Sequence, residues 1–240
     1  MDGIELTIRF ASKPNELKYC GPNCATSDFP IYLNDKSNLE DVKKSILRFE
    51  ALPVYLRAIA KKNNLDIFDY KVAEAYWIGN ELLDNFTVED MKEIIDELIK
   101  RGMYKPEGEK LKERLVEGLL PHHIFHVFYV EIGKTSGKIE PLFKFKETCR
   151  PSFGKVKRIL EDKLIVLRTP IINLENKKYK LSVEEESEIL YEKKFVGKIN
   201  PNDYVAIHWG QAVLKLNKSE VKNLEKYTNG FLNIFERLKN

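Results

Sequence analysis

The sequence predicts an α+β protein in which a mainly helical N-terminal domain precedes a small β-barrel with a C-terminal helix. Three observations lead to this fold class. Apolar residues recur at helical spacing between residues 37 and 119. Short segments of alternating apolar and polar residues, separated by turn residues, fill much of the chain from 142 to 216. An amphipathic segment at 218–238 closes the chain.

Start signals mark the predicted helices of the first domain. Asn38 can cap the first helix, Pro53 suits the opening turn of the second, and Thr87 can cap a helix that ends at Gly102. The segment from Tyr70 to Trp77 is a further short helix. The helices are therefore expected to begin near residues 39, 53, 70, 88 and 106.

Pro121 ends the helical pattern. The residues from Phe125 to Val130 alternate in the manner of a strand, and Leu142–Lys146 alternate as well. The first domain is therefore expected to cover residues 1–135 and to end in a strand, and the barrel with its helix to cover 136–240. The barrel strands are expected at 155–160, 164–169, 178–183, 188–196, 203–208 and 211–216.

Composition excludes several classes of function. Lys+Arg number 40 and Asp+Glu 37, so the charges nearly cancel and no nucleic-acid partner is expected. No apolar run reaches the ~18 residues of a membrane span, and no secretory signal opens the chain, so no membrane partner is expected. Three cysteines, an odd number, argue against a disulfide framework and indicate a reduced, cytoplasmic protein.

Three of the four histidines lie within five residues, as His122, His123 and His126. Histidine is a common metal ligand. On a strand, residues four apart share a face, so His122 and His126 are expected to point together and His123 to point away. The alternative is that these side chains are hydrogen-bonded core residues at a helix–strand junction.

Two further segments contain candidate cleft residues. Tyr19 and Cys20 precede a Gly-Pro turn that can expose a thiol, whereas Cys24 is the weaker candidate because Cys-x3-Cys matches no usual metal motif. Glu74, Tyr76, Trp77 and Asn80 lie at the end of a predicted helix and can face a pocket. For both segments the alternative is a role in the core.

Cys149 and His208 carry the strongest chemical signal. Cys149 stands among Arg150, Lys155 and Lys157, and nearby cations favour the thiolate that binds soft metals. His208 ends a predicted strand and is followed by Trp209 and a glycine that permits a close approach. The alternatives are a small apolar residue at the barrel mouth and a structural strand-end histidine.

Two strings in this region resemble the HypC/HupF family of hydrogenase maturation chaperones, which are small OB-like barrels. They are Cys-Arg-Pro-Ser-Phe-Gly-Lys-Val at 149–156 and Asp-Tyr-Val-Ala-Ile-His-Trp-Gly-Gln-Ala at 203–212. The resemblance covers roughly residues 147–232. It implies that the Cys149 thiolate carries iron destined for a nickel–iron hydrogenase and that His208 lies close by.

The sequence departs from this family in two ways. The family's cysteine is N-terminal and has a free amine beside it, whereas Cys149 is internal, so another donor is needed and the histidine cluster can supply one. Residues 170–196 are an insertion that can form an extra hairpin. The whole chain also resembles a poorly characterised family through its motifs at Tyr19–Pro22, Glu74–Asn80, Pro121–His126 and His208-Trp209.

Three functions follow as hypotheses. The first is a metallocentre maturation factor that holds an iron fragment through Cys149 and His208 and docks on a hydrogenase subunit or another maturation factor. The second is a metal-dependent enzyme in which His122, His126 and Glu74 hold a metal, with zinc as the alternative to iron. The third is a metal-free interaction module. The first hypothesis predicts that Cys149 and His208 approach each other and open onto a cleft with the histidine cluster, Tyr19-Cys20 and Glu74–Asn80.

Overall fold

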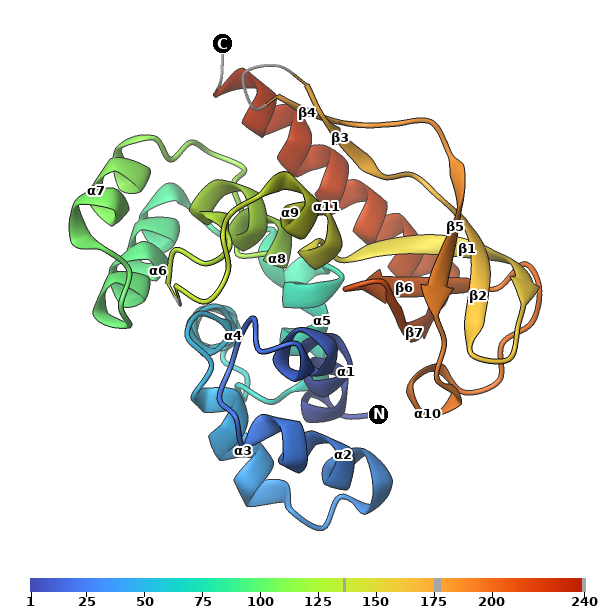
Figure 1. Cartoon of the computed structure of the whole chain (residues 1–240). Coiled ribbons are helices and arrows are strands. Elements are labelled where there is room, and N and C mark those ends of the chain that lie inside the picture. The colour runs from blue at the N-terminus through green and yellow to red at the C-terminus, as the bar shows by residue number, and fades with distance from the viewer. Residues whose placement is uncertain (136, 175–177, 239–240) are drawn as a thin grey trace.

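Helices form the N-terminal part of the molecule, and strands with one long helix form the C-terminal part, which confirms the α+β class (Figure 1). The computed structural model describes every residue except 136, 175–177 and 239–240. The N-terminal elements are α1 (Gly3–Glu16), α2 (Ala25–Asp35), α3 (Leu39–Leu47), α4 (Leu52–Asn63), α5 (Tyr70–Trp77), the 3-10 helix η1 (Glu81–Leu83), α6 (Val88–Lys100), α7 (Lys105–Glu113), α8 (His123–Phe125) and the π-helix η2 (His126–Glu131).

The predicted starts of α3 to α7 are confirmed within a residue or so. Thr87 forms a capping box with Asp90 at the start of α6, and a proline occupies the first turn of α4. Asn38 precedes α3 as predicted, although its side chain donates to the Asp28 carbonyl instead of capping the helix. The sequence pattern did not identify α1 and α2, each of which contains a proline.

The strands predicted at Phe125–Val130 and Leu142–Lys146 are wrong. The first segment is the end of α8 and the π-helix η2, and the second lies mostly in α9 (Phe143–Cys149). Residues 126–130 are all buried. A segment surrounded by protein on every side is apolar all round, so its pattern does not separate a helix from a strand.

The five-stranded sheet closes on itself in the order β1-β2-β5-β7-β6. Its neighbours pair antiparallel, apart from a short parallel contact between β5 and β7. The insertion contributes the antiparallel pair β3–β4 as expected, although residues 175–177 lie outside the described part. The elements are β1 (Ser152–Ile159), β2 (Lys163–Arg168), β3 (Ile171–Asn173), β4 (Tyr179–Leu181), β5 (Glu185–Leu190), the short helix α10 (Lys193–Val196), where a strand was expected, β6 (Tyr204–His208) and β7 (Gln211–Leu216).

The last helix, α11 (Lys218–Arg237), packs against α8 on one side and against β1, β4 and β7 on the other. Its Tyr227 hydroxyl donates to the Asn80 carbonyl at 2.6 Å. Gly79 makes this docking possible, because it has φ +93° and a Cβ there would collide with the Tyr227 ring.

Two hydrophobic clusters stabilise the fold. One fills the barrel interior around Val156, Val166 and Val205. The larger cluster joins the N-terminal helices to α11 and to the barrel end that carries Trp209. The two sequence segments 1–135 and 136–240 therefore share a core. Among the described residues, no helix combines the length and apolar character that crossing a bilayer would require.

Candidate metal centre

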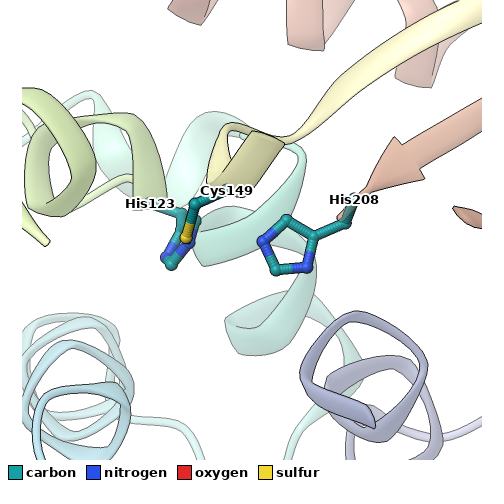
Figure 2. A group of neighbouring side chains, drawn as sticks. All are labelled: His123, Cys149 and His208. Carbon is teal, nitrogen blue, oxygen red and sulfur yellow. The ribbon is translucent and has the colours of Figure 1, made fainter. Parts of the chain in front are cut away.

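Three side chains from separate parts of the chain converge on one buried point. His123 begins α8, Cys149 ends α9 and His208 ends β6. One potential ligand atom from each lies within 4.8 Å of the other two. Figure 2 shows the three side chains pointing toward one another. The predicted approach of Cys149 and His208 is therefore confirmed.

Main-chain pairing brings the Cys149 and His208 segments together. Ser152 at the start of β1 pairs with Ile207, next to His208. Trp209 has φ 52°, an uncommon left-handed conformation for a bulky residue, and its N–H donates to the Thr148 carbonyl at 2.8 Å. This bond ties the end of β6 to the end of α9. The strained backbone beside the site is typical of positions where structure serves a function.

Hydrogen bonds determine which nitrogen of His208 faces the site. Nδ1 lies 2.6 Å from the Phe10 carbonyl oxygen, which can only accept, so Nδ1 carries the proton. Nε2 consequently holds a lone pair, is buried and has no hydrogen-bond partner. In Figure 2 the other ring nitrogen of His208 points toward Cys149. An unpaired buried acceptor aimed at a thiol and an imidazole is suited to bind a cation.

His123 is held in a similar way. Its Nδ1 lies 2.7 Å from the Tyr76 hydroxyl, and its Nε2 lies 3.4 Å from the Cys149 sulfur. When Nδ1–H donates to the tyrosine oxygen, Nε2 presents its lone pair beside the sulfur. Metal-binding histidines commonly donate their second ring N–H to such a partner, which orients the ring.

The site is built from neutral groups. Burial raises the pKa of the Cys149 thiol to about 12, so the expectation that nearby cations lower it is wrong. The cause is geometric: the Arg150 guanidinium is bound to Glu147, and Lys155 and Lys157 lie further along β1. Burial lowers the pKa of His208 to about 4 and that of His123 well below its ordinary value.

The ligand geometry fits a transition-metal ion. Ligand distances of about 2.0–2.1 Å to nitrogen and 2.3 Å to sulfur place tetrahedral N and S donors about 3.5 Å apart. The His123–Cys149 separation of 3.4 Å matches this value. Separations up to 4.8 Å need only a small side-chain rotation to close around an ion. Two imidazoles and a thiolate suit zinc, iron or copper better than magnesium or calcium.

A cavity of about 70 Å³ adjoins the three ligands and confirms part of the predicted cleft. Its walls include most of the predicted cleft residues together with residues from α1, the connection between α3 and α4, α4 itself, α5 and the segment after η2. The predicted residues among them are Tyr19, Cys20, Trp77, His123, His126, Cys149, His208 and Trp209.

Other predicted residues lie elsewhere. His122 caps α8 by accepting from the Ile124 N–H, stacks on Tyr227 and faces a separate pocket beside α11. Asn80 binds the Glu74 carboxylate at 2.7 Å and caps η1, so this pair stabilises a chain reversal. His122 and His126 therefore do not point together. His126 instead contacts the Tyr55 hydroxyl at 3.1 Å.

The sequence pattern placed one functional residue on the wrong face and missed one supporting group. His123 was assigned to the wrong face because a strand was expected. Tyr76 was a candidate in the Glu74–Asn80 segment, although its hydroxyl was not predicted to orient a ligand, and the Phe10 carbonyl was not a candidate. The sequence held a signal for Tyr76, which lies beside Trp77 in the Glu74–Asn80 motif, whereas a main-chain oxygen has no signature in a sequence.

Comparison with known proteins gives a family but no activity. The model of a family described as a family of unknown function, DUF6390, matches residues 1–240. The chain belongs to this family. No curated protein matches the chain, and no solved structure does either. The family match agrees with the resemblance to a poorly characterised family, and none of the comparisons links DUF6390 to the HypC/HupF chaperones.

Proposed function

We propose that this chain binds one transition-metal ion through His123 Nε2, Cys149 Sγ and His208 Nε2. The observation that carries the proposal is the unpaired Nε2 of His208, whose tautomer is determined by Phe10 and which faces a thiol and a second imidazole. The thiol loses its proton to solvent as the metal binds. Three protein ligands leave a fourth position open, as in sites that handle substrates rather than purely structural ones.

The proposed use of this metal is the maturation of another metallocentre. The chain would hold an iron fragment and release it to a protein partner, a hydrogenase subunit or another maturation factor. The resemblance of 149–156 and 203–212 to the HypC/HupF strings supports this role, and His123 supplies the additional donor that the missing terminal amine requires. Zinc is the alternative metal.

Metal analysis tests the binding site. Untagged protein, prepared without oxygen and incubated with Fe(II) or Zn(II), should retain about one ion per chain after gel filtration. Cys149→Ser and His208→Ala should retain far less. Cys24→Ser is the matched control, because Cys24 contacts Ser45 and lies outside the ligand group. Cys20→Ser should also keep its metal. Full occupancy of Cys149→Ser would refute the site.

The second candidate is a metal-dependent enzyme, and His126 favours it. This histidine lines the same cavity, is oriented by Tyr55, and its ring centroid lies 6.1 Å from that of His123. Burial lowers the pKa of His126 to about 4, so the imidazole is neutral and can hydrogen-bond a metal-bound water. Zinc-loaded protein assayed with an activated ester would then lose activity in His126→Ala while retaining its metal. A maturation factor shows no such turnover and instead binds its client in a Cys149-dependent way.

A further inference from the structure

Two indole N–H groups beside the proposed metal centre have no hydrogen-bond partner. Trp77 and Trp209 are 3% and 7% exposed, both line the cavity, and the Nε1 atoms of both are buried and unpaired. Burial raises the pKa of the Cys149 thiol, and the neighbouring Trp209 indole partly offsets that rise. Trp77 packs against both ligand histidines, with ring centroids 4.5 Å from His123 and 5.4 Å from His208. The Trp77 N–H thus lies beside both ligand rings without an acceptor.

The unpaired Trp77 N–H indicates that a bound ligand supplies its hydrogen-bond acceptor. Buried donors in proteins are nearly always paired, and each unpaired one costs the desolvation free energy of the group. The Tyr76 hydroxyl and the Phe10 carbonyl pair the Nδ1 atoms of the two ligand histidines and are not available to Trp77 as free acceptors. An acceptor on a molecule inside the cavity would complete the pairing of Trp77.

The charges around the metal position indicate whether the ligand is an anion or a cation. A divalent ion with one thiolate and two neutral imidazoles has a net charge of +1 in a buried place, and an uncompensated buried charge is costly. Glu50 is the one charged side chain among the described residues that line the cavity. Its carboxylate already binds Lys138 at 2.6 Å and the Gly21 N–H at 3.0 Å. The negative charge of Glu50 is therefore balanced by Lys138. The net charge of +1 at the metal still needs one negative charge from a ligand.

Cavity size sets an upper limit on the ligand. An apolar cavity of about 150 Å³ holds benzene. The cavity here is about 70 Å³, and apolar side chains such as Phe49, Ile132 and Ile139 form much of its wall. A ligand that reaches the open metal position must therefore contain only a few non-hydrogen atoms.

We infer that the open position of the metal centre takes a small monoanion, which binds the metal at one atom and accepts a hydrogen bond from the Trp77 indole. This inference rests on the proposed metal centre and defines its ligand class. It predicts selection by charge and by size in the same site.

The first test uses the unmodified chain loaded with Co(II), whose visible spectrum reports changes in coordination. Formate and formamide have nearly the same shape but differ in charge. Formate should change the Co(II) spectrum at a concentration at least about tenfold lower than formamide, because it neutralises the buried charge. Pivalate has the same carboxylate head group and should leave the spectrum unchanged because of its bulk. Equal effects of formate and formamide, or binding of pivalate as strong as that of formate, would overturn the inference.

The second test concerns Trp77. Azide titration of Co(II)-loaded protein should show a Kd about tenfold or more higher in Trp77→Phe, because a hydrogen bond to an anion is lost, with Co(II) stoichiometry unchanged. Trp209→Phe is the matched control. It should shift the sulfur-to-cobalt absorption band and change the azide Kd much less. Unchanged azide affinity in Trp77→Phe would refute the role of its N–H.

These outcomes separate two failures. If Co(II), Fe(II) and Zn(II) all fail to bind the unmodified chain, the proposed function is wrong. If a metal binds but small anions do not perturb it, only the ligand class is wrong. Should Trp77→Phe fail to fold, the comparison of formate, formamide and pivalate on the unmodified chain still decides the inference.

Discussion

The Nδ1 atom of His208 donates a hydrogen bond to the main-chain oxygen of Phe10, although the two residues are 198 positions apart. The bond links α1, at the start of the chain, to the end of β6. It also determines the tautomer that leaves Nε2 available at the candidate metal centre. One contact thus joins the two halves of the fold and prepares a ligand.

His208→Ala should therefore weaken the fold as well as the metal site. The change leaves the Phe10 carbonyl without its buried donor and creates a void, which together should cost about 2–4 kcal/mol in the free energy of unfolding. Urea denaturation of the metal-free protein measures this loss. Lys157→Ala, an exposed change in β1, is the control and should shift the free energy by less than about 0.5 kcal/mol. Equal stability of the two variants would show that the Phe10 bond contributes little.

Tyr76→Phe tests the orientation of His123. Removing the hydroxyl should lower metal affinity about 10–100-fold while the ion-to-protein ratio at saturation stays the same, because the histidine remains but is no longer held. A competition titration with a chromogenic chelator gives the affinity. The control is Tyr55→Phe, which removes the same group from non-ligand His126. A comparable loss of affinity in both variants would indicate general loosening of the core.

Metal-free protein should lose stability as the pH falls below about 6.5. The ordinary pKa of histidine is about 6.5 in the unfolded chain, whereas burial lowers the pKa of His122 to about 3 and of His126 and His208 to about 4, and lowers that of His123 as well. Between these values the unfolded state binds more protons, so the free energy of unfolding rises with pH. The slope near pH 5 should approach about 5 kcal/mol per pH unit for four such groups. Urea titrations at several pH values measure it, and a flat profile between pH 5 and 7 would contradict the burial of these rings.

Lys138→Ala should expose the centre to reagents. Lys138 donates to the Gly21 carbonyl at 2.8 Å and to Glu50 at 2.6 Å, and Ile139, the next residue, lines the cavity. Losing these bonds should loosen the segment and speed maleimide labelling of Cys149 several-fold, as read by peptide mass spectrometry. Lys134→Ala is the control, since Lys134 pairs with Glu107 instead. If Lys134→Ala speeds labelling as much as Lys138→Ala, the contacts of Lys138 do not control access.

Local signals in the sequence predicted much of the fold. The helix Tyr70–Trp77, the cap at Thr87 and the closing helix were all predictable because each has a start signal and a clear polar face. Strands β6 and β7 are buried almost throughout, and they were found because each is a short, largely apolar run bounded by turn residues.

The candidate site was only partly predictable. Cys149 and His208 were identified from their motifs, but His123 was placed on the wrong face. The segment from His126 to Glu131 is a π-helix with a wider turn than an α-helix, and its residues 126–130 are all buried. Neither the helical nor the strand period applies to it. The burial of Cys149, which raises its pKa, also depends on tertiary packing that a short sequence motif does not reveal.

The three proposed ligands belong to α8, α9 and β6, segments that approach only when the chain has folded. A bound ion would act as a cross-link between them. Because the ion would bind the folded chain and not the unfolded one, its binding free energy would add to the free energy of unfolding. Metal occupancy would then raise the midpoint of thermal unfolding for the helices and the barrel together. Loss of the ion would lower the stability of the N-terminal helix α1 as well.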